Sequence, residues 1–321
     1  MATIDYGGTQ YVLQDGESVL DGLLRQGAEV PHSCRKGSCH ACVLQAMAGD
    51  IPAEAQDGLK ETLRAQGYFK ACCCRPAGDL AIALADPDDR VAASLTRIEW
   101  VSPTVIRVRL TPSPPIEYHP GQFVTLVRED GLARSYSIAS LPEESALELH
   151  VRCLPKGRMS QWLAREARPG TWVQLGRASG DCFYLPGDPE QPLLLAGTGT
   201  GLAPLYGIAR DALAQGHTGP VWLFHGAGDR HGLYLEDALA ALSERHENFF
   251  YVPSVRRGPA PPGIEIGELG DGIRSAFPSL RGWKAYVCGN PEIVSTLRKQ
   301  LFMAGVASRA IHFDSFLPAA A

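Results

Sequence analysis

The 321-residue sequence has no apolar run long enough to span a bilayer and no cluster of basic residues. A membrane helix needs about 20 consecutive apolar residues, and nucleic-acid binding needs a basic surface, whereas the net charge here is −5. We therefore expect no membrane and no nucleic-acid partner. The first residues also lack a basic segment followed by an apolar one, so we expect no secretory signal.

Other signatures are missing as well. There is no G-x-S-x-G motif of a hydrolase, and no pair of histidines stands at metal-ligand spacing. Hydrophobic residues make up 45% and charged residues 20%, which predicts well-folded cores in two or three domains. The sequence has nine cysteines, an odd number, and we expect no secretory signal. This combination indicates metal ligation in a reducing compartment rather than disulfides. We expect a cytoplasmic monomer.

One cysteine cluster has a spacing that indicates its chemistry. Cys34, Cys39 and Cys42 follow C-x4-C-x2-C, and Cys72 comes later in the chain. This is the plant-type spacing of a 2Fe–2S cluster, which four thiolates hold. Zinc sites or scattered buried thiols are the alternatives, but zinc knuckles usually contain two C-x2-C pairs. Three adjacent cysteines could supply the fourth ligand, and Cys72 is preferred because C-x-x-x-P is typical of the closing ferredoxin ligand.

The periodicity of the sequence changes along the chain and predicts three domains. Residues 1–86 contain short strands, one helix and the cysteine loop, which suggests the β-grasp fold of plant-type ferredoxins. Residues 91–187 contain alternating strands separated by Pro and Gly, which fits an antiparallel β-barrel. Residues 190–321 alternate buried strands with helices, which predicts an α/β domain with a parallel sheet.

The barrel region carries a candidate flavin site. Arg134-Ser135-Tyr136-Ser137 would place a cation, an aromatic face and hydroxyls on one strand end, as a flavin needs. A half-buried strand with a solvated arginine is the alternative for so short a motif. The segment Gly157-Arg158-Met159-Ser160 at a helix start favours the flavin, because helix N-terminal amides bind pyrophosphate.

The third domain carries a candidate dinucleotide site. Gly197-Thr198-Gly199-Thr200-Gly201 joins a buried strand to a helix, so its amides can approach a pyrophosphate closely. It differs from G-x-G-x-x-G, and a tight strand-to-helix turn is the alternative. Cys288, followed by Gly289 and Pro291, ends another strand. Free cysteines are commonly core residues, and we expect Cys153 and Cys182 to be buried fillers of this kind.

These motifs and their order resemble the NADH-dependent reductase components of bacterial aromatic-ring oxygenases, of the benzoate dioxygenase reductase type. The resemblance covers nearly the whole chain. It implies that Arg134 binds the FAD phosphate, Tyr136 packs on the isoalloxazine ring and Ser137 lies at flavin N5. It also implies that Cys288 lies beside the nicotinamide and that Phe316 shields the flavin. The implied pyrophosphate segment consists of Val151 and Arg152 followed by Gly157, Met159 and Ser160.

The choice of nucleotide depends on the loop after strand 221–224. Asp229 would accept hydrogen bonds from a free ribose 2′-hydroxyl, whereas Arg230 would favour a 2′-phosphate. Both could also be solvated loop residues. We predict NADH, because Asp229 comes first, no second cation follows closely and the resembling reductases use NADH.

Together the motifs predict electron flow from NADH to FAD to 2Fe–2S and then to an acceptor outside the chain. A flavin converts between the two electrons of a hydride and the one electron that a cluster accepts. The resemblance implies a terminal oxygenase as partner, docking near the cluster loop. The alternatives are a reductase for dehydration of CDP-6-deoxy-glucoseen sugars and a 2Fe–2S sensing module without catalysis.

Overall fold

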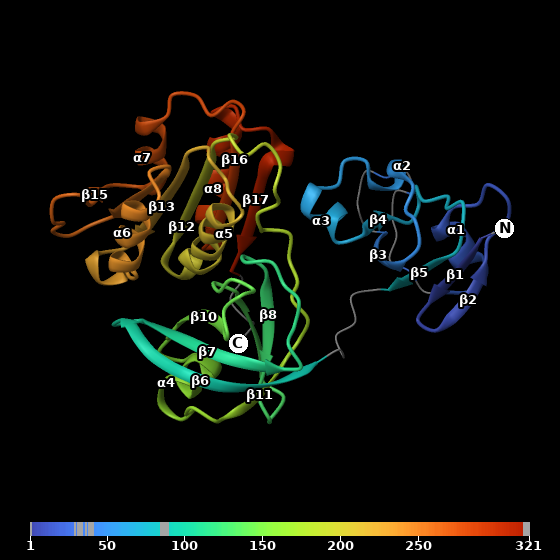
Figure 1. Cartoon of the computed structure of the whole chain (residues 1–321), viewed down its shortest axis with the longest axis horizontal. Helices are drawn as coiled ribbons and strands as arrows, with labels where there is room; N and C mark the ends of the chain where they lie inside the picture. The colour runs from blue at the N-terminus through green and yellow to red at the C-terminus, as the bar shows by residue number, and fades with distance from the viewer. Residues whose placement is uncertain are drawn as a thin grey trace. The chain divides into compact units, whose positions relative to one another are not determined.

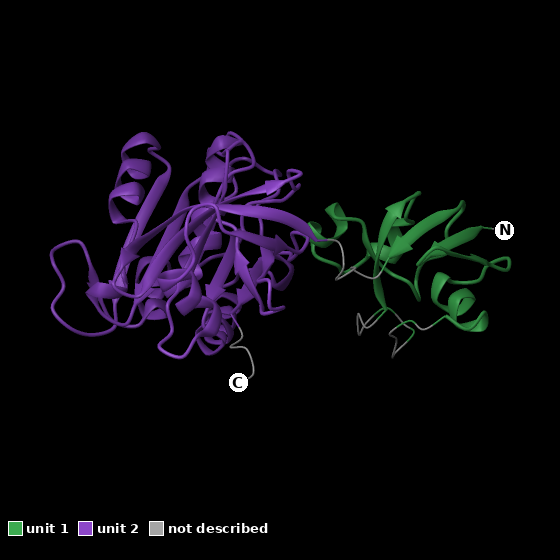
Figure 2. Cartoon of the chain, turned by 90° about the horizontal axis from the view of Figure 1, so that it is seen from below, with its two compact units in different colours: residues 1–88 green, residues 89–321 purple. Residues whose placement is uncertain are grey.

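A computed structural model describes residues 2–28, 30, 35, 37, 42–83 and 90–316. The chain divides into two compact units, residues 1–88 and residues 89–321 (Figure 2). The second unit contains both the barrel and the parallel sheet. The boundary proposed between residues 187 and 190 therefore stays a prediction. None of the helices in the described ranges is long and apolar enough to cross a membrane.

The first unit is a five-stranded mixed sheet with short helices. Its sheet order is β2-β1-β5-β3-β4, with β1 and β5 parallel. The elements are β1 Thr3–Tyr6, β2 Thr9–Val12, α1 Val19–Arg25, β3 Val43–Ala48, α2 Ala53–Gln56, α3 Glu61–Ala65, β4 Tyr68–Lys70 and β5 Leu80–Ala83. Ser18 caps α1 by accepting the Asp21 N–H, and α1 buries Leu20 and Leu23 in the core.

A six-stranded antiparallel sheet opens the second unit, in the order β10-β7-β6-β11-β8-β9. A bridge between Ile138 and Leu149 joins its two outer strands, so the sheet closes into a barrel. The elements are β6 Val91–Ser102, β7 Val105–Ser113, β8 Phe123–Val127, β9 Ala133–Ser137, β10 Leu147–Arg152, α4 Arg158–Arg165 and β11 Trp172–Leu175.

The rest of the second unit is a doubly wound α/β fold (Figure 1). Its six strands are all parallel and run β15-β14-β13-β12-β16-β17. The elements are β12 Leu193–Thr198, η1 Gly199–Gly201, α5 Leu202–Ala214, β13 Val221–Ala227, η2 Arg230–Gly232, α6 Glu236–Arg245, β14 Phe249–Val255, β15 Glu265–Ile266, α7 Leu269–Ala276, β16 Lys284–Gly289, α8 Pro291–Met303, η3 Ser308–Ala310 and β17 Ile311–Ser315. The mixed sheet, the antiparallel barrel and the parallel sheet confirm the predicted fold class.

Successive residues of β12 face opposite cores, which explains its unbroken apolar sequence. Leu193 and Leu195 pack with α5 and α6, and Leu194 and Ala196 pack with α7 and α8. The chain leaves β12 for β13 on one side, whereas β16 lies on the other side. Ligands of open α/β sheets bind at such a switch point, outside the carboxyl ends of the strands. The glycine loop after β12 lies at this position.

Candidate functional site

Three parallel strands and one barrel strand meet at this edge of the sheet. In register, Gly197 of β12 lies beside Cys288 of β16, and Cys288 lies beside Asp314 of β17. The hydroxyl of Ser137, at the end of β9, donates a 3.0 Å hydrogen bond to the Asp314 carboxylate. Ser137 is separated from Asp314 by 177 positions in the sequence. The tertiary structure thus brings predicted flavin and nicotinamide residues together at one point.

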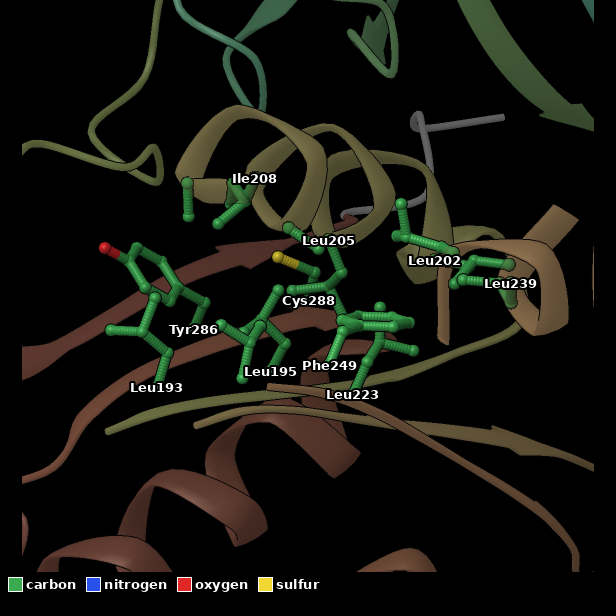
Figure 3. Packing of buried hydrophobic residues seen from close by; sticks show 14 of the residues in the cluster. Leu193, Leu195, Leu202, Leu205, Ile208, Leu223, Leu239, Phe249, Tyr286 and Cys288 are labelled. Carbon is green, nitrogen blue, oxygen red and sulfur yellow. The ribbon is translucent and has the colours of Figure 1, made fainter. Parts of the chain in front are cut away.

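Cys288 is buried at this point rather than exposed to solvent. Figure 3 shows its thiol beneath α5, near Leu195 and Leu205. Its sulfur lies 3.6 Å from the sulfur of Cys182, a residue that we predicted from the sequence to be a buried core filler. Burial, followed by the neighbouring Cys182, raises the pKa of the Cys288 thiol well above its usual value. Cys288 is therefore a neutral thiol at physiological pH and not a nucleophile.

Asp314 is the site residue that the sequence analysis missed. Burial raises the pKa of its carboxyl group, and this effect outweighs the hydrogen bond from Ser137, which lowers it. The available signal was a single carboxylate in a short strand, directly after Phe313. That signal is weak, because a carboxylate at a strand end is usually solvated.

Asp314 predicts a pH-dependent difference in stability. Because the folded-state pKa of Asp314 is raised, its contribution to the free energy of unfolding is fully present below the ordinary carboxyl pKa. This contribution is lost as pH rises through the raised pKa. Asp314→Asn should therefore gain stability relative to the unaltered protein as pH rises through the raised pKa of Asp314. Heat-induced FAD release, followed by flavin fluorescence, measures this gain. Asp237→Asn, at an exposed carboxylate, is the control, and an equal pH dependence for both variants would contradict the prediction.

The glycine loop has the geometry that a dinucleotide pyrophosphate requires. Gly199 has a φ of +54°, and a Cβ added there would meet open space. At Gly197 an added Cβ would lie 2.9 Å from the Cys288 carbonyl oxygen, and at Gly201 it would overlap the same carbonyl. Two glycines thus allow the close approach of the loop to β16, and the third turns the chain towards α5. The loop amides and the α5 N-terminus fit a bound pyrophosphate.

The predicted flavin residues line one stretch of β9. Tyr136 is half-buried and packs against the barrel core, while Ser135 is exposed and its hydroxyl lies 3.0 Å from that of Thr125. Arg134 is half-buried and donates to the Ala133 carbonyl. Burial raises the pKa of the Tyr136 hydroxyl, so this ring stays neutral. A neutral aromatic face beside a cation fits a flavin phosphate and ring.

The predicted pyrophosphate segment surrounds the start of α4. The Ser160 hydroxyl accepts from the Leu154 N–H and donates to the Gly157 carbonyl, both at 3.2 Å, which holds the loop before the helix. Arg152 is exposed. The side chains of Val151 and Met159 are buried in the barrel core, so only their backbone could face a cofactor.

The nucleotide-choice residues lie after β13 at the same edge. Asp229 accepts the His231 N–H at 3.0 Å, and Arg230 forms a 2.6 Å ion pair with Glu236. The backbone of a further arginine also lies near this loop. Arg256 follows β14, and its N–H donates to the Ala227 carbonyl at 2.9 Å.

Two of the four predicted cluster ligands belong to the described residues. The Ala71 N–H donates to the Cys42 carbonyl at 3.0 Å, which brings the buried Cys42 and Cys72 to neighbouring positions. Cys34 and Cys39 lie outside the described residues. Two buried thiols on adjacent segments fit the thiolate donor set of a 2Fe–2S cluster. At the other end of the chain, Phe316 is half-buried and its N–H donates to the Gly289 carbonyl at 2.9 Å.

Three domain families match the chain in sequence order. A 2Fe-2S iron-sulfur cluster binding domain matches residues 2–77, an oxidoreductase FAD-binding domain matches residues 92–184, and an oxidoreductase NAD-binding domain matches residues 195–299. The ferredoxin–NAD(P)+ reductase component of naphthalene 1,2-dioxygenase/salicylate 5-hydroxylase systems from Ralstonia sp. is 32% identical, over 95% of both chains. The chain belongs to this family of iron–sulfur flavoprotein reductase components.

Other members of the reductase family cover equally much of the chain. The reductase subunit of an aromatic O-demethylase from Amycolatopsis sp. is 34% identical over 98% of both chains. The crystal structure of the Amycolatopsis cytochrome P450 reductase GcoB has a TM-score of 0.71 and 33% identity, and covers 100% of both chains. The chain described here is thus an oxidoreductase with 2Fe–2S, FAD and NAD domains. These domains and relatives confirm the predicted electron path from NADH to FAD to 2Fe–2S.

Proposed function

We propose that this reductase delivers electrons to a terminal oxygenase component, with the residues assembled around Ser137, Cys288 and the glycine loop as its nicotinamide–flavin site. The observation that carries the proposal is the meeting of β9 with the carboxyl ends of β16 and β17 through the Ser137–Asp314 hydrogen bond. Relatives named as reductase components of dioxygenase systems match over nearly their whole length, which supports this class of partner.

Each group of residues has a separate task in the proposed site. The amides of Gly197 to Gly201 bind the dinucleotide pyrophosphate, and Arg134 pairs with the flavin phosphate. Tyr136 supports the isoalloxazine ring, and Phe316 covers the exposed side of that ring until nicotinamide displaces it. When bound, FAD supplies the conversion between a two-electron hydride and single electrons.

Ser137 and Cys288 control the reacting centre in this proposal. The Ser137 hydroxyl donates to Asp314, which fixes the orientation of this side chain at the end of β9. Cys288 adds an uncharged, buried thiol packed against Leu195 and Leu205. These apolar contacts exclude water from one side of the site, and dry surroundings strengthen hydrogen bonds within it.

The acceptor proposal is tested with the purified, cofactor-loaded reductase. Anaerobic NADH should bleach the flavin and then the iron–sulfur absorption, and cytochrome c should be reduced rapidly in the steady state. A protein that binds both cofactors but does not pass electrons to cytochrome c would be a sensing module. Coupled turnover with a candidate oxygenase component then tests the partner, whereas turnover only with a deoxysugar dehydratase would favour that alternative.

A cytochrome P450 is the second candidate acceptor. The 33% identity and full-length match to the Amycolatopsis cytochrome P450 reductase favour it. NADH-dependent appearance of the reduced, CO-bound P450 spectrum is a direct readout. It separates this acceptor from a non-haem oxygenase in the same assay.

Replacing Ser137 with alanine should slow flavin reduction by NADH by at least about tenfold, while FAD content stays unchanged. The change removes the hydroxyl that the resemblance places at flavin N5 and leaves the buried Asp314 carboxyl group without its hydrogen-bond donor. A typical hydrogen bond is worth about 0.5–1.5 kcal/mol, and the upper end of that range corresponds to about tenfold in rate. Anaerobic stopped-flow absorption measures the rate. Ser145→Ala removes an exposed hydroxyl from the barrel outside the flavin motif and is the matched control. Equal rates for the Ser137 variant and the unaltered reductase would refute the role.

Catalytic efficiency with NADH should exceed that with NADPH by at least about tenfold, which requires about 1.4 kcal/mol of discrimination. Asp229 would repel a 2′-phosphate, and the Glu236 carboxylate already engages Arg230. Asp229→Ala should narrow the preference, as initial rates with the two nucleotides would reveal. A preference for NADPH in the unaltered reductase would instead identify Arg230 and Arg256 as phosphate ligands.

A further inference from the structure

A network of polar side chains, buried except at Arg109, runs from the barrel into the parallel-sheet domain. Arg109 donates to the Glu148 carboxylate at 2.9 and 3.0 Å, and Glu148 lies 3.0 Å from Nε2 of His150. Nδ1 of His150 lies 3.1 Å from the hydroxyl of Tyr234. His150 and Tyr234 are both almost fully buried. This network of side chains therefore links β10 of the barrel to the segment between β13 and α6.

This network ends beside a second buried histidine, His225. The rings of Tyr234 and His225 meet edge to face, with centroids 5.6 Å apart. His225 is 0% exposed, its Nδ1 lies 3.3 Å from the Tyr251 hydroxyl, and its Nε2 lies 3.3 Å from the carbonyl oxygen of Gly199. His225 thus contacts the glycine loop from behind and cannot itself reach a ligand.

The hydrogen-bond partners determine the tautomer of His225. A carbonyl oxygen only accepts, so Nε2 of His225 must carry the proton and donate to Gly199. Burial lowers the pKa of His225 to about 4, so the ring is neutral and its Nδ1 accepts from the Tyr251 hydroxyl. By the same reasoning, Nε2 of His150 donates to Glu148, and Tyr234 donates to Nδ1 of His150.

The bond to Gly199 has a consequence for the loop amides. The Gly199 carbonyl also accepts the Leu202 N–H, so both of its lone pairs are used on the inner side of the loop. In a planar trans peptide the next N–H points opposite to the carbonyl. Holding the Gly199 carbonyl inward therefore directs the Thr200 N–H outward, towards the side where Gly199 has open space.

We propose that His225 is a positioning residue for the dinucleotide, because its Nε2–H holds the Gly199 carbonyl and so orients the Thr200 amide towards the pyrophosphate. The inference rests on the proposed binding of NADH at the glycine loop. Tyr251 donates to Nδ1 of His225 and so stabilises this tautomer, and Tyr234, held by His150 of the barrel, supports the ring from its edge.

The test separates nucleotide binding from flavin reduction in the full-length reductase. Anaerobic stopped-flow flavin reduction over a range of NADH concentrations yields the dissociation constant and the limiting rate independently. His225→Phe keeps a buried ring but loses the donor, and should raise the dissociation constant for NADH about tenfold or more. The limiting rate should stay within about twofold, and FAD content should not change. His225→Gln restores an N–H donor near the Nε2 position and should recover most of the affinity.

A matched histidine in the same domain controls for lost packing. His217 is also buried, and its Nδ1 lies 3.3 Å from the hydroxyl of Tyr184, but it precedes β13 at the opposite edge of the sheet. His217→Phe should leave the dissociation constant for NADH unchanged. If His225→Phe loses its FAD, Tyr251→Phe compared with Tyr184→Phe carries the same test, with an increase of about threefold expected only for Tyr251.

Two outcomes would overturn the positioning role. One is NADH binding by His225→Phe as tight as that of the unaltered reductase, and the other is an equal loss in His217→Phe. Failure of the proposed function looks different, because the unaltered reductase itself would then show no saturable flavin reduction by NADH.

Discussion

Replacing Cys72 with serine should abolish the visible absorption of the 2Fe–2S cluster while FAD remains bound. Cys72 is buried and follows Ala71, whose N–H donates to the carbonyl of the predicted ligand Cys42. A serine hydroxyl is a weaker iron ligand than a thiolate at neutral pH, so we expect loss of the cluster that four thiolates hold. The flavin lies in the other compact unit, so its absorption should persist.

The adjacent cysteines make this experiment decisive. Cys74 is fully buried in the core of the first unit, and its carbonyl accepts the Val19 N–H, so Cys74→Ser should keep the cluster. Cys73 is the stronger alternative as fourth cluster ligand. Its sulfur lies 3.7 Å from that of Cys72, and it would be 2.7 Å from a Cβ added at Gly37, a residue of the cysteine loop. Cluster loss in Cys73→Ser with retention in Cys72→Ser would transfer the ligand assignment. Visible absorption and iron content are the measurements.

Gly201→Ala should raise the dissociation constant for NADH by about a hundredfold or more, without loss of FAD. The added methyl group would overlap the backbone carbonyl of Cys288, which is part of the interior strand β16 and cannot move freely. The loop must then move away from β16, and the amides that would bind pyrophosphate move with it. A hundredfold change corresponds to about 2.7 kcal/mol, within the range expected for forced overlap in a packed region.

Gly216→Ala is the matched control for this variant. Gly216 follows α5 with a φ of +81°, and a Cβ there meets open space, so the change strains the backbone without touching the loop. Titration of flavin reduction against NADH should show nearly unaltered affinity for this control. Comparable affinity losses in both variants would mean that general destabilisation, and not loop geometry, explains the effect of Gly201→Ala.

The sequence alone determined the cofactors and the order of the domains, and it predicted most of the candidate binding residues. These features are local, because C-x4-C-x2-C, the motif at Arg134 and the loop from Gly197 to Gly201 each lie within a few residues. Their chemistry follows from side-chain type and spacing along one turn or loop. The change from alternating strands to strand–helix repeats is also a local periodicity, so it predicted the barrel and the parallel sheet.

Only the tertiary structure brought distant residues together. The Ser137–Asp314 bond depends on how the barrel packs against the carboxyl ends of β16 and β17, and no local pattern encodes that packing. The proximity of Cys182 to Cys288 and the contact of His225 with Gly199 have the same origin. Burial then changes the chemistry of these groups, because desolvation raises the pKa of Asp314 and lowers that of His225. A sequence records which groups can ionise, but the fold decides which of them lose their water.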